Sequence, residues 1–271
     1  MAESETMRAD AALAARGLAP SRERARALIE GGLATVNGLT IDKPARRVTA
    51  EDRLAVIGDT HPYVSRGGLK LEKALKAFEV DVNGQICVDV GASTGGFTDV
   101  LLRNGAKHVY AVDVGTAQLH ESLQNHPRVT SMERVNARTL NRAMFPEAPT
   151  LAVMDVSFIS IRLILPALFD LLGVDGRVIS LVKPQFEAGR QFVGKGGIVA
   201  KPDVHRDVLQ KLVAFTPGLG WQVVGLDFSP ISGGDGNLEF LADILPVSCG
   251  IASVDDALIA DVVGKAHAAN L

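Results

Sequence analysis

The sequence predicts an α/β protein in which a doubly wound, mostly parallel sheet forms the main domain and a small α+β module precedes it. Two observations indicate the main domain: apolar strand-like runs alternate with helical segments from Ile86 onward, and a glycine-rich loop directly follows the first run. A third indicates the module, because two short helical blocks precede Asn37-Gly38, a dipeptide typical of a tight β-hairpin. We expect the module at residues 6–60, a linker at 61–66 and the main domain at 67–271.

The composition is that of an ordinary globular protein, with 47% hydrophobic and 22% charged residues. A net charge of −3 and a pI near 6.1 do not indicate nucleic-acid binding, so such a function must rest on local basic clusters. The N-terminus is polar, and no apolar run approaches the roughly 18 residues of a membrane span, so we expect a soluble, cytoplasmic chain. Cys87 and Cys249 lack metal or disulfide spacing, so we expect reduced core thiols and no metal.

The module is expected to contain two helices followed by short strands. Apolar residues recur at helical spacing in MRADAALAARGL and again in RERARALIE. Ser21 stands directly before the second block, where a hydroxyl commonly caps a helix. The hairpin around Asn37-Gly38 supplies two strands, and RRVTAEDRLAVIG supplies one or two more.

Basic residues of the module indicate a possible partner. Residues 1–60 carry nine Lys/Arg and nine Asp/Glu, but Arg22 and Arg26 lie four positions apart on one helix face. Taken alone, such a pair could be an ordinary solvated face. The pattern R-x-D-x-x-L-x-x-x-G-L-x-x-S-R-x-x-A-x-x-L-I, which begins at Arg8, resembles the RNA-binding domain first named from ribosomal protein S4. The resemblance implies that Arg8, Ser21, Arg22 and Arg26 contact RNA phosphates, which would position RNA without reading its sequence.

The main domain alternates strands and helices along the chain. We expect ICVDVG (86–91) and HVYAVDVG (108–115) as its first strands, with FTDVLLRNG between them as a helix ending at Gly105. Later strands are expected in TLAVMD, VISLVKPQF, WQVVGLDFSPI and NLEFLADIL. Helical periods occur in VHRDVLQKLVAF and VDDALIADVVGKAHAA. This alternation is typical of a mostly parallel sheet.

The loop DVGASTGGFT after the first strand is the expected cofactor site. It lacks the G-x-G-x-x-G of dinucleotide enzymes, because Ser93 occupies the third position. Asp89, ahead of the first glycine, would repel a pyrophosphate but suits an ammonium or sulfonium group, which favours S-adenosylmethionine. Asp113 closes the second strand, where a carboxylate can grip ribose hydroxyls, although it could instead cap the next helix. The expected cofactor-binding residues are Asp89, Gly91, Ser93, Gly95, Gly96, Asp113 and Asn136.

Asn136 is included because it falls where the third strand is expected to end. It could contact an adenine there, or it could be a turn residue.

Four charged residues lie in or beside apolar runs or just ahead of the first strand, and charge in such positions is costly unless it is paired or used. They are Lys70, Asp155, Lys183 and Glu239. The turn that begins at Asp155, Asp-Val-Ser-Phe, lacks the prolines typical of enzymes that methylate base amino groups. Neither cysteine is suitably placed as the nucleophile that carbon-5 methylation of pyrimidines needs. A hydroxyl acceptor remains, and it needs a base.

Lys183 is the expected base. A free lysine has a pKa of about 10.4, which burial and a nearby cation both lower. Lys70 would supply that cation, while Asp155 and Glu239 would orient the two lysines. Lys183 could then take the hydroxyl proton while the oxygen attacks the methyl group. Each of the four could also be an ordinary capping or surface charge.

The main domain as a whole resembles the FtsJ-like ribose 2′-O-methyltransferases, in YVSRGGLKLEKAL, DVGASTGGFTDVLL and LVKPQFEAGR. In that family a Lys–Asp–Lys–Glu tetrad carries the acceptor chemistry, and the resemblance places Lys70, Asp155, Lys183 and Glu239 on it. Together with the module, the pattern resembles the TlyA-type rRNA (cytidine-2′-O)-methyltransferases, often called haemolysins. This resemblance implies S-adenosylmethionine as cofactor and ribosomal RNA in the ribosomal subunits as partner.

Other basic residues agree with an RNA path, and Arg66 is expected to contact RNA beside Lys70. The same is expected of Lys73, of Lys76 and of a glycine-rich stretch, EAGRQFVGKGGIVAK, that could be a mobile loop over the acceptor. A membrane-active haemolysin is one rival, but it would need an amphipathic or spanning segment and an export signal. A non-catalytic ribosome-binding factor is another. RNA contacts on both domains favour a monomer.

Overall fold

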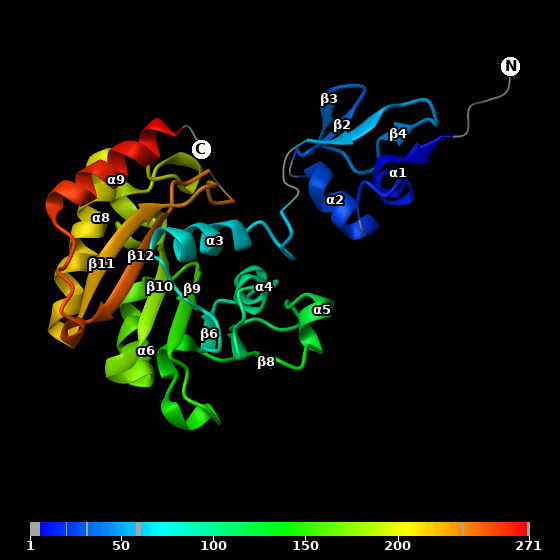
Figure 1. The fold of residues 1–271 in the computed structure, drawn as a ribbon. Helices are drawn as coiled ribbons and strands as arrows, with labels where there is room; N and C mark the ends of the chain where they lie inside the picture. The colour runs from blue at the N-terminus through cyan, green and yellow to red at the C-terminus, as the bar shows by residue number, and fades with distance from the viewer. Residues whose placement is uncertain (1–5, 20, 31, 58–60, 235, 270–271) are drawn as a thin grey trace, which may run out of the picture. The chain divides into compact units, whose positions relative to one another are not determined.

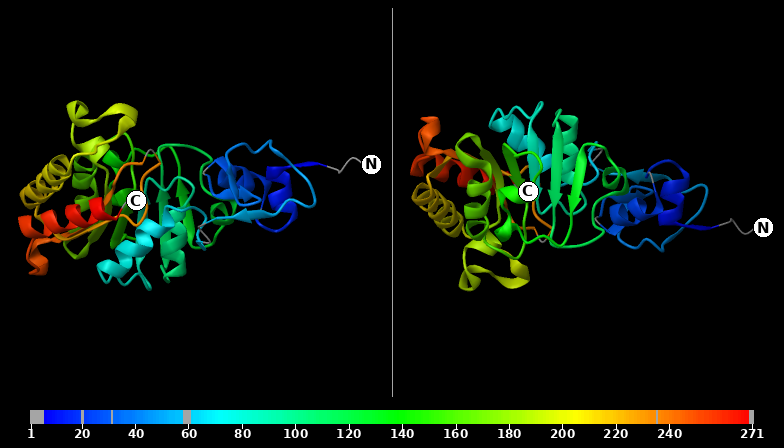
Figure 2. Two further views of the ribbon diagram at one scale, coloured as in Figure 1. Left: turned by 90° about the horizontal axis from the view of Figure 1, so that it is seen from above. Right: turned by 90° about the horizontal axis from the view of Figure 1, so that it is seen from below.

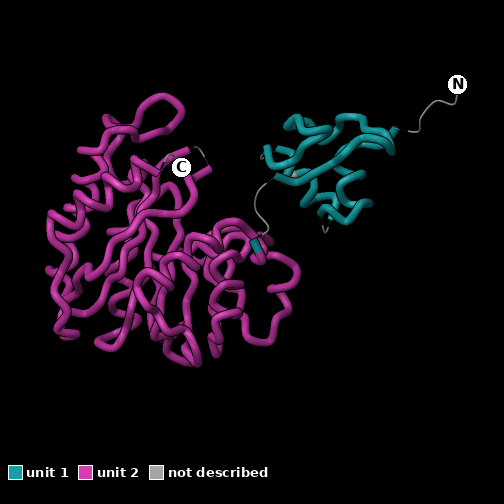
Figure 3. Tube along the Cα trace, turned by 45° about the horizontal axis from the view of Figure 1, so that its top comes forward, with its two compact units in different colours: residues 1–61 teal, residues 62–271 magenta. Residues whose placement is uncertain are grey.

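The computed structural model describes residues 6–19, 21–30, 32–57, 61–234 and 236–269. The chain divides into two compact units, Met1–His61 and Pro62–Leu271 (Figure 3). Each unit has its own buried apolar core and is described by itself. The expected domain limits stay predictions, and residue 60, the expected end of the module, lies outside the described residues.

The smaller unit contains two helices and five short strands among its described residues. They are β1 (Met7–Arg8), α1 (Ala9–Ala15), α2 (Arg22–Glu30), β2 (Ala34–Val36), β3 (Leu39–Ile41), β4 (Arg47–Val48) and β5 (Leu54–Val56). Strand β2 pairs with both β3 and β5, and β1 pairs with β4, all antiparallel.

Local residues explain two turns of this unit. Asn37 (φ 54°) and Gly38 (φ 83°) both take the left-handed backbone that a two-residue hairpin turn requires, so the predicted hairpin is confirmed. The hydroxyl of Ser21 accepts a hydrogen bond from the backbone N–H of Arg24 at 3.1 Å. This bond satisfies a free N–H of the first turn of α2, so the predicted helix cap is confirmed as well.

The larger unit is built on a seven-stranded sheet, ordered β11-β12-β10-β9-β6-β7-β8 (Figure 1). The strands are β6 (Ile86–Val90), β7 (His108–Val112), β8 (Val129–Met132), β9 (Leu151–Met154), β10 (Arg177–Val182), β11 (Trp221–Phe228) and β12 (Phe240–Pro246). Neighbours from β10 to β8 are parallel, whereas β12 runs antiparallel to both β10 and β11. The predicted mostly parallel sheet is therefore confirmed.

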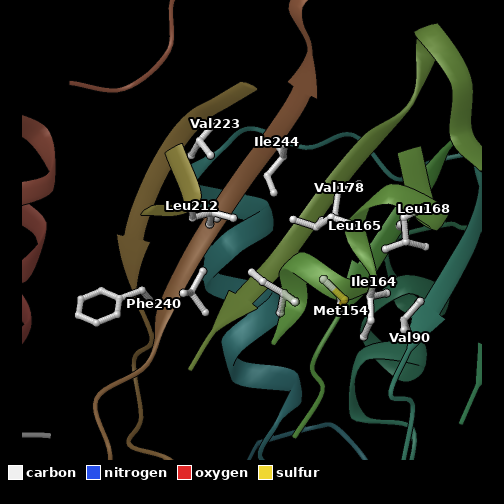
Figure 4. Close-up of a cluster of buried hydrophobic side chains, with 14 of the residues drawn as sticks. Val90, Met154, Ile164, Leu165, Leu168, Val178, Leu212, Val223, Phe240 and Ile244 are labelled. Carbon is white, nitrogen blue, oxygen red and sulfur yellow. The ribbon is translucent and has the colours of Figure 1, made fainter. Parts of the chain in front are cut away.

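Helices cover both faces of this sheet, as Figure 2 shows from above and below. The helices of this unit are α3 (Gly68–Ala77), α4 (Gly96–Arg103), α5 (Glu121–Gln124), α6 (Leu165–Leu172), α7 (Pro184–Glu187), α8 (Pro202–Phe215) and α9 (Asp256–Ala268), and all except the short α7 contribute residues to the cores on the two faces. Strand side chains alternate between the two faces: Val88 packs in one core, with residues of α6, α8 and α9, and Cys87 in the other, with residues of α3 and α4. Figure 4 shows part of the first core, including Leu168 and Val178. Burial on both faces explains why the strands are continuous apolar runs.

Two expectations about single positions are wrong. Cys249 is exposed rather than in the core, because it ends a 3₁₀ turn (Val247–Cys249) after the chain has left the sheet. Cys87 is buried as expected, and burial raises the pKa of its thiol to about 12. Asn136 does not end the third strand, since β8 stops at Met132 and Asn136 instead caps a 3₁₀ turn (Ala137–Thr139).

Candidate active site

The loop between β6 and α4 is pressed closely against its neighbours. Gly91 (φ 82°) and Gly95 (φ 93°) take left-handed backbone conformations that favour glycine. A Cβ at Gly91 would overlap the backbone oxygen of Asp155, and one at Gly96 would overlap the hydroxyl of Ser65. Glycine is therefore required here so that the loop can lie between the turn after β9 and the segment before α3.

Asp113 ties this loop to the end of β7. Its Oδ2 accepts a hydrogen bond from the backbone N–H of Ser93 at 2.8 Å, and its Oδ1 accepts one from Gly115 at 2.7 Å. The carboxylate lines a small cavity at the ends of β6, β7 and β8. The lining comprises Ala92, Ser93, Ala111, Asp113, Gly115, Gln118, Leu119, Ser131 and Glu133.

Asn136 is not part of this lining. Its side-chain oxygen accepts a hydrogen bond from the backbone N–H of Arg138 at 3.1 Å, so it serves the following turn. Ser131 in β8 and Glu133 directly after it line the cavity at this end of the strand. The error follows from placing the end of β8 too late in the sequence.

A larger cavity of about 210 Å³ lies between the glycine loop and the ends of β9 and β10. Its lining comprises Ser65, Gly67, Gly91, Ala92, Ser93, Thr94, Gly96, Phe97, Asp155, Ser157 and Lys183. Two of the four predicted acceptor residues, Asp155 and Lys183, thus share one cavity with the predicted cofactor loop. Adjacency of this kind is what a group-transfer reaction needs.

Asp89 has a different environment from the one expected. It is fully buried within β6 and lines neither cavity. Its Oδ2 accepts a hydrogen bond from the Thr98 hydroxyl at 2.7 Å, while no described residue donates a hydrogen bond to its Oδ1. Burial raises the pKa of this carboxyl to about 7, although the bond from Thr98 acts in the opposite direction.

The four predicted acceptor residues lie together in one cluster. The Lys183 amino group is 2.5 Å from Asp155 Oδ1, and that of Lys70 is 3.7 Å from Asp155 Oδ2. Lys70 is also 2.5 Å from Glu239 Oε2. The order is Lys183, Asp155, Lys70, Glu239, so cations and carboxylates alternate. Lys70 is therefore paired with both carboxylates, as expected for residues that orient the two lysines, and Asp155 lies between Lys70 and Lys183.

Sheet topology explains why residues so distant in sequence meet. Asp155 and Lys183 directly follow the parallel strands β9 and β10, which end at the same edge of the sheet. Glu239 directly precedes the antiparallel β12, which begins at that edge. Lys70 comes from the first turn of α3. Lys70, Lys183 and Glu239 are buried, and buried charges are tolerated because each is paired.

The turn after β9 contributes two residues that the sequence analysis missed. The Ser157 hydroxyl accepts a hydrogen bond from the Lys183 amino group at 2.9 Å. Phe158 has a left-handed backbone (φ 65°) and is 91% exposed, and its ring lies 5.2 Å from that of Phe186. A bulky residue in that conformation is strained, and strained backbone of this kind is found most often at active sites and ligand clamps. Their place directly after Asp155 was the signal that could have identified them.

The basic residues expected to contact RNA have varied surroundings. Arg66 is exposed just before α3. Lys73 instead binds within the larger unit, at 2.9 Å from Asp227 and with its amino group over the Phe228 ring. It therefore holds α3 to β11.

In the smaller unit, Arg8 and Arg22 both pair with Asp10, and hydrogen bonding from Arg8 lowers the pKa of that carboxyl to about 2. Arg26 pairs with Glu30 at 2.8 Å. All three guanidinium groups keep substantial exposure, and a phosphate would compete with these carboxylates.

No helix in the described part of the chain is long and apolar enough to cross a membrane. Within the same residues, no three His, Cys, Asp or Glu side chains are grouped so as to hold a metal ion.

Comparison with protein families gives two matches. The family model described as FtsJ-like methyltransferase matches residues 63–243, and that of the S4 domain matches residues 7–54. Similar proteins include "Putative rRNA methyltransferase YqxC" of Bacillus subtilis, 52% identical over 88% of this chain and 85% of that protein. They also include "16S/23S rRNA (cytidine-2'-O)-methyltransferase TlyA" of Mycobacterium tuberculosis (46%; 86% and 87%) and "Hemolysin A" of Brachyspira hyodysenteriae (42%; 88% and 100%).

Solved structures agree with these matches. One from Streptococcus thermophilus is 46% identical with a TM-score of 0.78, and the match covers 98% of each chain. Another, from Lactococcus lactis, is 51% identical with a TM-score of 0.71, covering 75% of this chain and 97% of the other. A methyltransferase from Listeria monocytogenes, 16% identical with a TM-score of 0.50 over 67% of this chain and 99% of the other, shares the fold alone.

Proposed function

Because the chain belongs to the FtsJ-like methyltransferase family, we propose that it methylates the 2′-hydroxyl of cytidine in ribosomal RNA. The S4 domain and the relatives named as rRNA methyltransferases support RNA as the substrate. One observation carries the proposal: Asp155 and Lys183, two members of the alternating row of lysines and carboxylates, line the same cavity as the glycine loop. This arrangement suits removal of a proton from a hydroxyl beside a bound methyl donor.

The residues around this cavity fit S-adenosylmethionine. The glycine loop would carry its methionine part, and Asp113 would hold the ribose, as carboxylates do at the end of the second strand in this class of sheet. Above its pKa of about 7, the buried carboxylate of Asp89 would add negative potential behind the loop, which would suit a cationic ligand and not a pyrophosphate. Bound there, the cofactor would supply a methyl group on a sulfonium, an electrophile that a hydroxyl oxygen can attack directly.

Lys183 is the proposed general base. In its uncharged form its amino group would take the proton of the 2′-hydroxyl, and the ammonium that results would face Asp155 at 2.5 Å. Ser157 accepts a hydrogen bond from the same amino group, which would help to aim the lone pair. Lys70, held by Glu239, contacts the second oxygen of Asp155 and would keep that carboxylate in place.

Phe158 is proposed to stack on the nucleobase of the nucleotide whose ribose accepts the methyl group. Its ring is almost fully exposed beside Ser157, which lines the cavity, and Phe186 supports it from α7. Aromatic rings hold unstacked nucleobases by stacking on them. A ribose can reach the enclosed amino group of Lys183 only after its nucleotide leaves the RNA stack.

Methyl transfer to ribosomal subunits tests this function. Subunits lacking the modification are incubated with S-adenosylmethionine carrying a tritiated methyl group and with wild type or K183A. We expect incorporation with wild type, at a 2′-oxygen, and a rate about 10²- to 10⁴-fold lower with K183A, the usual contribution of a general base. K211A is the matched control, because Lys211 is an exposed lysine of α8 paired with Asp207.

Two outcomes would contradict the proposal. No incorporation by wild type into either subunit would exclude the enzyme function and favour a binding factor. Lysis of red cells by the pure protein, equal in wild type and K183A, would favour the haemolysin activity for which one relative is named.

A further inference from the structure

Asn237 is a buried amide that joins two loops at the edge of the sheet where the tetrad lies. It is 1% exposed and lies two residues before Glu239. Its Oδ1 accepts a hydrogen bond from the backbone N–H of Val199 at 2.9 Å, and its Nδ2 donates one to the carbonyl of Gly197 at 3.0 Å. Because one partner is a donor and the other an acceptor, the orientation of the amide is determined.

The first of these loops lies over Glu239. The backbone carbonyl of Asn237 accepts a hydrogen bond from Gly233 at 2.9 Å, which closes the loop between β11 and β12. A Cβ at Gly233 would lie only 2.6 Å from Glu239 Oε1, so this backbone is packed directly against the carboxylate. Glu239 in turn holds Lys70. Asn237 therefore holds in place the loop between β11 and β12, which covers the Lys70–Glu239 pair.

The second loop is the glycine-rich stretch that follows Lys183. It carries the exposed cations Arg190 and Lys195, and it returns to the core at Val199. Gly197 and Val199 are the two positions that Asn237 holds. The amide is thus a direct link between a basic loop and the loop over the tetrad.

Val199 is also held from its other side. Its carbonyl accepts a hydrogen bond from Nε2 of the buried His205 in α8 at 2.9 Å, and His205 Nδ1 lies 3.0 Å from His267 Nε2 in α9. Burial lowers the pKa of His205 to about 4, so the ring is neutral and donates through one nitrogen only. The amide of Asn237, just before β12, and the imidazole of His205, in α8, therefore hold the backbone of Val199 from two sides.

We propose that Asn237 is a positioning residue for methyl transfer. It holds the basic loop after Lys183 and the loop that covers Lys70–Glu239 in fixed positions relative to each other. The proposal rests on the function proposed above. It assigns Asn237 no contact with either substrate. Its loss would misplace the tetrad relative to the RNA while leaving the cofactor loop, on the far side of β9, unchanged.

The test uses N237D in the full-length protein. This substitution keeps the oxygen that accepts from Val199 but replaces the donor facing Gly197 with a second acceptor. N104D is the matched control, because Asn104 also donates from its side chain to a backbone carbonyl, that of Val100 at 2.8 Å, but at the far end of α4. The measurements are the dissociation constant for S-adenosylmethionine, the melting temperature, and kcat and KM for ribosomal subunits.

We expect N237D to bind S-adenosylmethionine as wild type does and to lose about tenfold or more in kcat/KM, because small misplacements of reacting groups cost rates of that order. The ratio of N237D to wild-type activity should rise as the pH is lowered, since a protonated carboxyl can donate to Gly197 again. Unchanged kcat/KM in N237D, or an equal loss in N104D, would overturn the proposal.

Hydrogen exchange provides a readout that does not depend on activity. In N237D, or in N237A if that variant folds better, amides of residues 197–199 and 229–234 should exchange faster than in wild type, while those of the cofactor loop should not. Unchanged exchange in both segments would overturn the proposal even if wild type proved inactive. Normal hydrogen exchange and activity in N237D, together with an inactive K183A, would contradict the positioning role of Asn237 but leave the proposed methyltransferase function standing.

Discussion

Asp89 carries an energetic cost that depends on pH. Burial raises the pKa of its carboxyl from the ordinary 3.8 to about 7, so the folded protein binds a proton there more tightly than the unfolded chain does. Stability from this group is therefore full below pH 3.8 and is lost as the pH rises to 7. At about 1.4 kcal/mol for each pH unit, the cost above pH 7 is at most about 4 kcal/mol.

We expect D89N to stabilise the larger unit at pH 8, by about 1–3 kcal/mol, because an amide has no charge to bury. The gain should shrink as the pH is lowered to 4, where the wild-type carboxyl is protonated. Urea unfolding followed by fluorescence of Trp221, the single tryptophan, measures it, since this side chain is buried in β11. A gain independent of pH would show that the buried charge is not its cause.

D89N should also bind S-adenosylmethionine more weakly, since the cationic ligand would lose the negative charge behind the loop. Titration calorimetry measures this at pH 8. Unchanged affinity would show that Asp89 is only structural, through its bond to Thr98.

Phe158 offers a second test at the scale of single residues. We expect F158A to reduce kcat/KM for ribosomal subunits by about 10- to 100-fold, because stacking on one aromatic ring contributes about 1–3 kcal/mol per base. F158Y is the control, since it keeps the ring, and it should remain close to wild type. Binding of S-adenosylmethionine should be unchanged in both. Full activity of F158A would exclude the proposed base platform.

At the scale of elements, the predicted strands that became β6, β7, β9, β11 and β12 and the long helices α8 and α9 are present in the structure because their apolar periods are long and regular. The predicted strand VISLVKPQF is correct only as far as Val182, because Pro184–Glu187 form the short helix α7. The ends of β8 could not be predicted equally well. Its residues are partly exposed, since β8 lies at the edge of the sheet, so its sequence lacks a continuous apolar run. The misplacement of Asn136 follows directly from that ambiguity.

The contact between α8 and α9 predicts a second pH dependence, of opposite sign. The pKa of His205 is lowered from 6.5 to about 4, so the unfolded chain binds the proton more tightly than the folded one. Stability from this group is full above pH 6.5 and is lost as the pH falls to 4, by at most about 3 kcal/mol. We expect the unfolding free energy of H205Q to depend less on pH within this window than that of wild type.

H120Q is the control for that measurement, because His120 is exposed on a different part of the unit. Glutamine at position 205 can still donate to the Val199 carbonyl, so the fold should persist. A wild-type curve parallel to that of H205Q between pH 6.5 and 4 would show that burial of the imidazole has no energetic consequence.

At the scale of the whole molecule, two units with separate cores are proposed to share one substrate. We expect R26Q to reduce the slope of log K against log [salt] for binding to ribosomal RNA by about 0.7–0.9, the effect of one phosphate contact. K211Q is a close control, because Arg26 and Lys211 are both exposed and each pairs with a carboxylate four residues away. Equal slopes in wild type and R26Q would contradict the prediction that Arg26 contacts an RNA phosphate.

The sequence alone determined the α/β class, the glycine loop and the four charged residues, because apolar periodicity, glycine and charge are properties of the chain itself. The tertiary structure decided how those charges are ordered. The parallel ends of β9 and β10 and the antiparallel start of β12 bring Asp155, Lys183 and Glu239 to one edge of the sheet, and Asp155 lies between the two lysines. It also decided the places of Ser157, Phe158 and Asn237, because backbone conformation and burial in loops depend on contacts that no local pattern records.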